Sequence, residues 1–93
     1  MEDRLRIAIT GGTSGLGLAL VREWHRRGAH VAFVARTRED VARVAAELPG
    51  TLGVVGDVSK KGDIHPIALQ VAGRLGGLDV LVNNASSLGT VPL

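Results

Sequence analysis

A glycine-rich run near the start of the chain has the residue types of a phosphate-binding turn. The run from Thr10 to Gly17 reads TGGTSGLG and lies between a strand-like segment at 5–10 and a helical pattern at 16–27. Glycines allow a tight bend, close approach of backbone amides to a pyrophosphate, and close packing of the helix on a sheet. A helix N-terminus also favours negative charge. We therefore predict a nucleotide-phosphate turn formed by Gly11, Gly12, Thr13, Ser14, Gly15, Leu16 and Gly17.

The alternative is a loop that is rich in glycine by chance, and an isolated glycine motif would be a weak signal. The spacing differs from the GxGxxG pattern of the commoner dinucleotide fingerprint. No Gly-Lys-Ser/Thr follows, which argues against a P-loop. The position of the run between a strand and a helix favours cofactor binding.

Arg36 bears on the choice of cofactor, because it directly follows a second strand-like segment at 30–35. A site for NAD commonly has an acidic side chain near this point to bond the ribose hydroxyls. A guanidinium can instead bind the 2′-phosphate of NADP through charge-assisted, bidentate hydrogen bonds. Arg38 is a second cation close by. A merely solvated arginine is the alternative, but the turn upstream favours NADP(H) over NAD(H).

Two further motifs follow later strand-like segments: Asp57-Val58 comes after 52–55, and Asn83-Asn84-Ala85 comes after 78–82. With the glycine turn they form three separated motifs in order. From about residue 5 onward the chain thus resembles the short-chain dehydrogenase/reductase family of NAD(P)-dependent oxidoreductases.

The resemblance implies a role for each motif. Asp57 and Val58 would border the adenine, the carboxylate accepting from the exocyclic amino group and the valine supplying apolar contact. Asn83 would brace the central sheet, and Asn84, followed by Ala85, would contact the ribose. Ser86 replaces the glycine that ends the family's Asn-Asn-Ala-Gly motif. Ordinary turns at strand ends are the alternative for both motifs.

Alternating strand-like and helix-like segments predict βαβ units and a parallel sheet. The first helix has Leu16, Ala19, Leu20 and Trp24 at intervals of three or four residues, which predicts its buried face. Thr37 is the expected cap of a second helix at 38–48, with Asp40 completing a reciprocal cap. A third helix is expected at about 61–75. Ser59 and Asp63 are both candidate caps for it, and Pro66 favours the later one.

Right-handed crossovers give a Rossmann-type, doubly wound α/β sheet of order 3-2-1-4, truncated after the fourth strand. The first two helices would cover one face and the third helix the other. A ligand would lie at the carboxyl ends of strands one and four, where the order reverses. Residues 1–93 are predicted to be the N-terminal part of a single NAD(P)-binding domain.

Composition excludes several classes of function. With 93 residues the chain is at most one small domain, and its net charge of +2 comes mostly from scattered arginines that are expected to be solvated. Nucleic-acid binding would need denser basic clusters and stacking aromatics. No apolar run or signal peptide indicates a membrane. The chain contains no cysteine, and its three histidines lack the spacing of a metal site. We expect a cytoplasmic protein.

The chain contains no tyrosine, and its only lysines are Lys60 and Lys61. The family transfers hydride with a Tyr-x-x-x-Lys pair and a serine beyond the Asn-Asn-Ala-Gly motif. We therefore expect the cofactor-binding half of an oxidoreductase, without catalytic residues and inactive alone. The complete enzyme would be a homo-oligomer, and this half would self-associate through its exposed fourth strand. A non-catalytic dinucleotide- or partner-binding module is the alternative. A methyltransferase half is disfavoured by Arg36.

Overall fold

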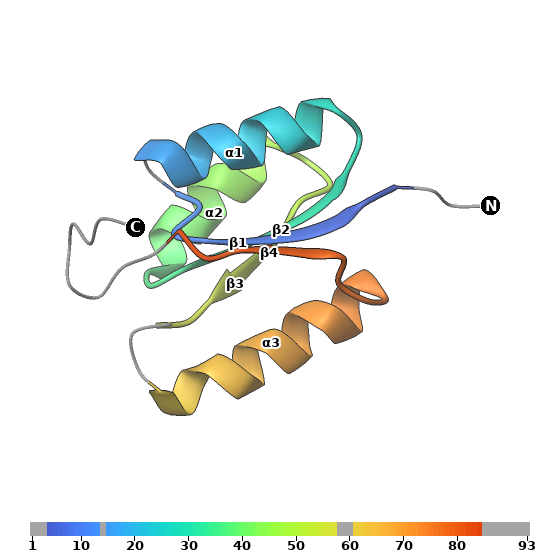
Figure 1. The fold of residues 1–93 in the computed structure, drawn as a ribbon. Helices are drawn as coiled ribbons and strands as arrows, with labels where there is room; N and C mark the ends of the chain where they lie inside the picture. The colour runs from blue at the N-terminus through green and yellow to red at the C-terminus, as the bar shows by residue number, and fades with distance from the viewer. Residues whose placement is uncertain (1–3, 14, 58–60, 85–93) are drawn as a thin grey trace.

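The computed structural model describes residues 4–13, 15–57 and 61–84, in which strands and helices alternate (Figure 1). The four strands are parallel and lie in the order β3-β2-β1-β4. This confirms the predicted Rossmann-type α/β sheet and its strand order. In chain order the elements are β1 Arg6–Thr10, α1 Gly15–Arg26, β2 His30–Ala35, α2 Arg38–Glu47, β3 Leu52–Val55, α3 Lys61–Leu75 and β4 Val80–Val82.

Helices cover both faces of the sheet, α1 and α2 on one and α3 on the other (Figure 1). Successive residues of a strand point to opposite faces, so β1 and β2 contribute to two separate cores. The core beneath α1 and α2 contains Ile7, Ile9, Val21, Val31, Phe33 and Val44. The core against α3 contains the smaller set Ala8, Ala32, Val34, Val54 and Val71.

The buried face of α1 differs from the predicted one. Leu16 is 67% exposed, and Ala19 is also exposed, whereas Val21 is fully buried. The helix presents Gly17 and Val21 to the sheet because the backbone of the preceding turn already lies close to the first helical turn. Trp24 packs against the edge of this core as predicted, and the Arg27 guanidinium lies 5.4 Å from its ring centroid.

Thr37 caps α2 as expected, because its hydroxyl oxygen accepts a hydrogen bond of 3.3 Å from the backbone N–H of Asp40. The Asp40 carboxylate pairs with Arg43 at 3.2 Å. The Asp40 carboxylate therefore forms an ion pair with a side chain three residues later on the same helix.

The bounds of α3 agree with the expected range 61–75, but the favoured cap is wrong. The helix begins at Lys61, ahead of the favoured cap Asp63, so that Pro66 lies inside it. Proline has no N–H to donate to the carbonyl four residues earlier, and its ring crowds that carbonyl. Here that residue is Gly62, which is exposed and has open space around it. Water can therefore solvate the Gly62 carbonyl that receives no hydrogen bond from Pro66.

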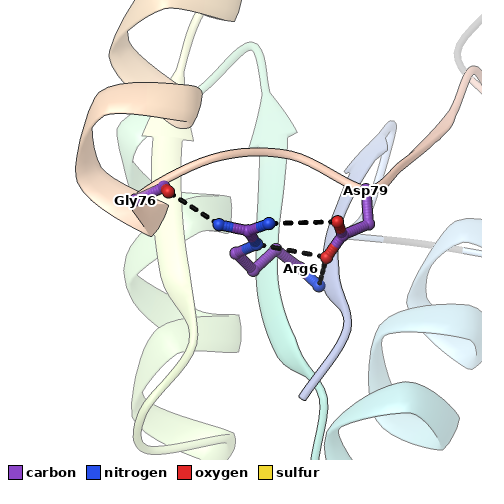
Figure 2. Close-up of polar contacts among 3 residues, drawn as sticks. All are labelled: Arg6, Gly76 and Asp79. Atoms are coloured by element: carbon purple, nitrogen blue, oxygen red, sulfur yellow. Dashed lines mark hydrogen bonds and ion pairs between the residues drawn. The ribbon is translucent and has the colours of Figure 1, made fainter. Parts of the chain in front are cut away.

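Arg6 ties the start of β1 to the start of β4 (Figure 2). Its Nε and Nη2 each donate to the Asp79 carboxylate at 3.1 Å, and its Nη1 donates to the Gly76 carbonyl at 2.7 Å. Asp79 also accepts from the Arg6 backbone N–H at 2.9 Å. This clamp aligns β4 with β1, so that Ile7 pairs with Val80 and Ile9 with Val82.

The arginines that were expected to be merely solvated are exposed but ion-paired. Arg22 of α1 binds Glu47 of α2 at 2.6 Å, and Glu23 receives both Arg26 and Arg27. Exposed pairs of this kind add little stability, because water and salt screen them. None of the helices in the described ranges is long and apolar enough to cross a membrane.

The clamp predicts an acid-sensitive contribution to stability. Hydrogen bonds from Arg6 hold the pKa of Asp79 below its ordinary value. A depressed carboxylate pKa stabilises the fold above the unfolded-state pKa of about 4, and this stabilisation is lost as the pH falls through the folded-state pKa. We expect Asp79→Asn to lower the free energy of unfolding at pH 7. The difference in the free energy of unfolding between the variant and the wild type should disappear below about pH 4. Urea unfolding across this range measures it, and a constant difference would contradict the assignment.

Candidate functional site

The glycine turn joins β1 to α1 and is anchored on the neighbouring strand. Gly11 and Gly15 have φ values of 67° and 54°, in the left-handed region that glycine adopts without strain. The backbone N–H of Gly11 donates to the Val34 carbonyl at 2.9 Å. The turn therefore starts as a continuation of the β1–β2 ladder and then leaves the sheet for the helix.

Two glycines of this turn are required by close packing. A Cβ at residue 17 would overlap the carbonyl oxygen of Gly11 and approach Asn84 Nδ2 to 2.7 Å. A Cβ at residue 12 would lie 2.6 Å from Cβ of Phe33 and 3.0 Å from Cγ2 of Val21. Real side chains essentially never make such short contacts. Gly15, in contrast, is exposed and faces open space.

Thr10 connects the glycine turn to the asparagines after β4. Thr10 is only 6% exposed. The hydroxyl oxygen donates to Asn83 Oδ1 at 3.2 Å and accepts from the Asn84 backbone N–H at 2.9 Å. Asn84 Nδ2 then donates to the Gly11 carbonyl at 3.3 Å. The structure thus brings together two predicted motifs that lie about 70 residues apart in sequence.

Sequence reasoning placed Thr10 at the end of a strand and at the head of the glycine run, but assigned no contact to its hydroxyl. Its hydroxyl is both a donor and an acceptor, so it can bond the side chain of one asparagine and the backbone of the next. The signal was its place directly before Gly11, opposite the end of the neighbouring strand β4.

The predicted residues after β2 and β3 lie at the same edge of the sheet. Arg36 directly follows β2 and is exposed, and Asp57 lies two residues beyond β3 and is partly buried. The backbone N–H of Gly56 donates to the Ala35 carbonyl at 2.9 Å, which holds these two strand ends side by side. The predicted site residues Ser14, Val58 and Ala85 lie outside the described residues.

The electrostatics of this edge suit an anion. The first turn of α1 contains no acidic residue, so its free N–H groups and dipole keep a positive partial charge. The first turn of α2 contains Glu39 and Asp40. Among the helices that start here, α1 is therefore better suited than α2 to receive a phosphate.

An apolar cavity of about 130 Å³ lies on the other face of the sheet, between the strands and α3. Only Thr10 and Asn83 among its lining residues are polar, and they connect it to the site just described. The other residues that line it are Ala8, Val34, Ile67, Ala68, Val71, Leu78 and Leu81.

The groups at this edge are of the kinds that bind a phosphate-containing ligand. Backbone amides, two asparagines and an exposed arginine offer hydrogen bonds and positive charge along one edge. Within the described ranges no three of His, Cys, Asp and Glu are grouped as metal ligands.

Comparisons with known proteins agree with this geometry. The family model for short chain dehydrogenases matches residues 6–93. L-fucose dehydrogenase of Rattus norvegicus is 38% identical over 79 residues, which is 85% of this chain and 29% of that protein. The mitochondrial dehydrogenase/reductase SDR family member 2 of Homo sapiens is 37% identical over 97 residues, covering 91% of this chain and 35% of that protein.

Solved structures match in fold as well. A short-chain dehydrogenase from Streptomyces avermitilis has a TM-score of 0.81 at 32% identity, covering 92% of this chain and 32% of its own. The 3-ketoacyl-(acyl-carrier-protein) reductase from Brucella melitensis, complexed with NADH, has a TM-score of 0.77 at 31% identity, covering 86% and 33%. The chain spans about a third of the length of these relatives.

The glycine turn, the parallel sheet and the asparagine pair are thus found together in a chain that the family model matches almost from end to end. The chain belongs to the short-chain dehydrogenase/reductase family of oxidoreductases.

Proposed function

We propose that this chain binds NADP(H) and is the cofactor half of an oxidoreductase that transfers hydride to or from a carbonyl or alcohol substrate. One observation carries the proposal. Arg36 directly follows β2, at the edge of the sheet where the glycine turn leads into a helix that has no acidic residue in its first turn. The Brucella neighbour was solved with NADH, which supports a nicotinamide dinucleotide. The preference for NADP(H) rests on Arg36.

The proposed roles follow from the contacts at this edge. The pyrophosphate lies against the backbone of residues 11–17, because Gly15 is open and α1 favours an anion. The 2′-phosphate pairs with the Arg36 guanidinium. Asn84, fixed by Thr10 and the Gly11 carbonyl, contacts the ribose, while Asp57 borders the adenine.

The nicotinamide, when bound, supplies the hydride acceptor or donor. The residues of this chain bind and orient the cofactor and transfer no proton, since the chain has no tyrosine to act as a phenolic acid. A non-catalytic module that binds a dinucleotide or a partner chain is the second candidate. The exposed β4 strand favours it, because Val80 is 39% and Leu81 59% exposed, and Leu81 also lines the apolar cavity.

The cofactor preference can be reversed at one residue. Arg36→Asp removes the partner of the 2′-phosphate and introduces a carboxylate that accepts from ribose hydroxyls. Titration with NADPH and NADH should show tighter NADPH binding by the wild type and tighter NADH binding by the variant. Arg74→Asp, which makes the same charge change on exposed α3, is the matched control. Equal affinities in the wild type, or tighter NADH binding, would refute the NADP(H) assignment.

The glycine turn should not tolerate a side chain at residue 17. Gly17→Val places a Cβ on the Gly11 carbonyl, so it should abolish NADPH binding while helix content by circular dichroism stays largely intact. Gly17→Ala tests the smallest such change. Gly73→Ala, in α3 with open space around the added Cβ, should bind normally. Unchanged binding by the residue 17 variants would mean that the pyrophosphate lies elsewhere.

The purified chain should self-associate and lack reductase activity. β4 is an edge strand of the described sheet, with unpaired backbone groups beside exposed apolar side chains. Sedimentation should show oligomers or aggregates, and NADPH should stay reduced in the presence of aldehydes, ketones or quinones. A sharp monomer with cooperative unfolding would favour the stand-alone module. NADPH oxidation proportional to the concentration of this chain would disprove its inactivity.

A further inference from the structure

Arg43 contacts the backbone of the glycine turn, and the roles proposed above do not include it. Its Nη2 donates to the backbone carbonyl of Thr13 at 3.0 Å and to the Asp40 carboxylate at 3.2 Å. Thr13 is only 8% exposed, whereas the Arg43 side chain is 55% exposed. A side chain of α2 thus reaches a buried part of the glycine turn, 30 residues earlier in the chain.

This contact completes the anchoring of the turn. Gly11 is held by the Val34 carbonyl and by Asn84, both from the sheet side. Gly12 also donates to the Val34 carbonyl, at 3.4 Å, so the contact at Thr13 extends the anchoring one residue further along a glycine-rich backbone. A guanidinium bonded to a carbonyl is a charge-assisted contact and therefore a stronger anchor than a neutral one. Asp40 holds the guanidinium in place.

We infer that Arg43 is a positioning residue for the phosphate turn, which acts on the cofactor through the Thr13 carbonyl. The inference rests on the proposed dinucleotide binding. The turn faces the pyrophosphate, which NADPH and NADH share, so Arg43 supports both cofactors equally. Arg36, in contrast, discriminates between them.

Nucleotide titration of paired variants tests this inference. Arg43→Met should weaken NADPH and NADH binding by the same factor, about tenfold for one charge-assisted hydrogen bond. Arg43→Lys should restore part of the affinity, because an ammonium can donate one hydrogen bond to the carbonyl. Arg22→Met is the matched control. Arg22 links α1 to α2 through Glu47 with a similarly exposed side chain, and it should leave both affinities within about twofold, since a screened surface pair contributes little.

Three binding results would overturn the inference: unchanged affinity in Arg43→Met, a loss confined to NADPH, or an equal loss in Arg22→Met. A measurement without nucleotide separates this inference from the proposed function. The backbone N–H groups of Gly11 and Gly12 both donate to Val34. Their amide hydrogen exchange should be faster in Arg43→Met than in Arg22→Met. If the wild type binds neither nucleotide, the proposed function fails. Equal exchange in the two variants refutes the anchoring role by itself.

Discussion

The pairing of β1 with β4 is the constraint on which the site depends. Three helices and two strands separate β1 from β4 in the chain, yet the alignment of these two strands decides whether the asparagines meet the glycine turn. A slip of one residue would turn every β4 side chain to the other face. Arg6 and Asp79 prevent it at one end, and Thr10 prevents it at the other. The Arg6–Asp79 ion pair at the amino ends of β1 and β4 thus helps to align the glycine turn and the asparagines at the carboxyl ends of these strands.

Close packing and charge act together in the glycine turn. Gly17 lets α1 approach so near that the Gly11 carbonyl occupies the space of a side chain. That carbonyl accepts from Asn84, which in turn is held by Thr10. The turn is thereby fixed by contacts from β2, β4 and α2, while Gly15 stays open to a ligand. A turn that is fixed on several sides and open at Gly15 suits an anion that must be received by backbone amides.

Sequence patterns predicted the strands and their order, because periodicity and handedness are local and general rules. They failed where a tertiary neighbour decided the outcome. Leu16 fits a helical apolar stripe but is exposed, because α1 packs on the sheet and the turn through Gly17 and Val21 instead. Pro66 lies within α3, because exposed Gly62 tolerates it. The contacts of Arg6 and Arg43 span 73 and 30 residues, and no pattern in the sequence pairs those partners. The role of each cofactor-site residue and the cytoplasmic location stay predictions.

Because of Trp24, the intrinsic fluorescence of the protein reports on one face of its sheet only. Trp24 is the only tryptophan, the chain has no tyrosine, and it packs on the core beneath α1 and α2. Its fluorescence therefore reports unfolding of the core beneath α1 and α2. It does not report unfolding of α3, whose core is built largely of alanine and valine. Circular dichroism reports the combined helix content of α1, α2 and α3. Fluorescence and circular dichroism transitions will coincide only when both layers leave the sheet together, so any separation between them measures how independently the smaller core melts.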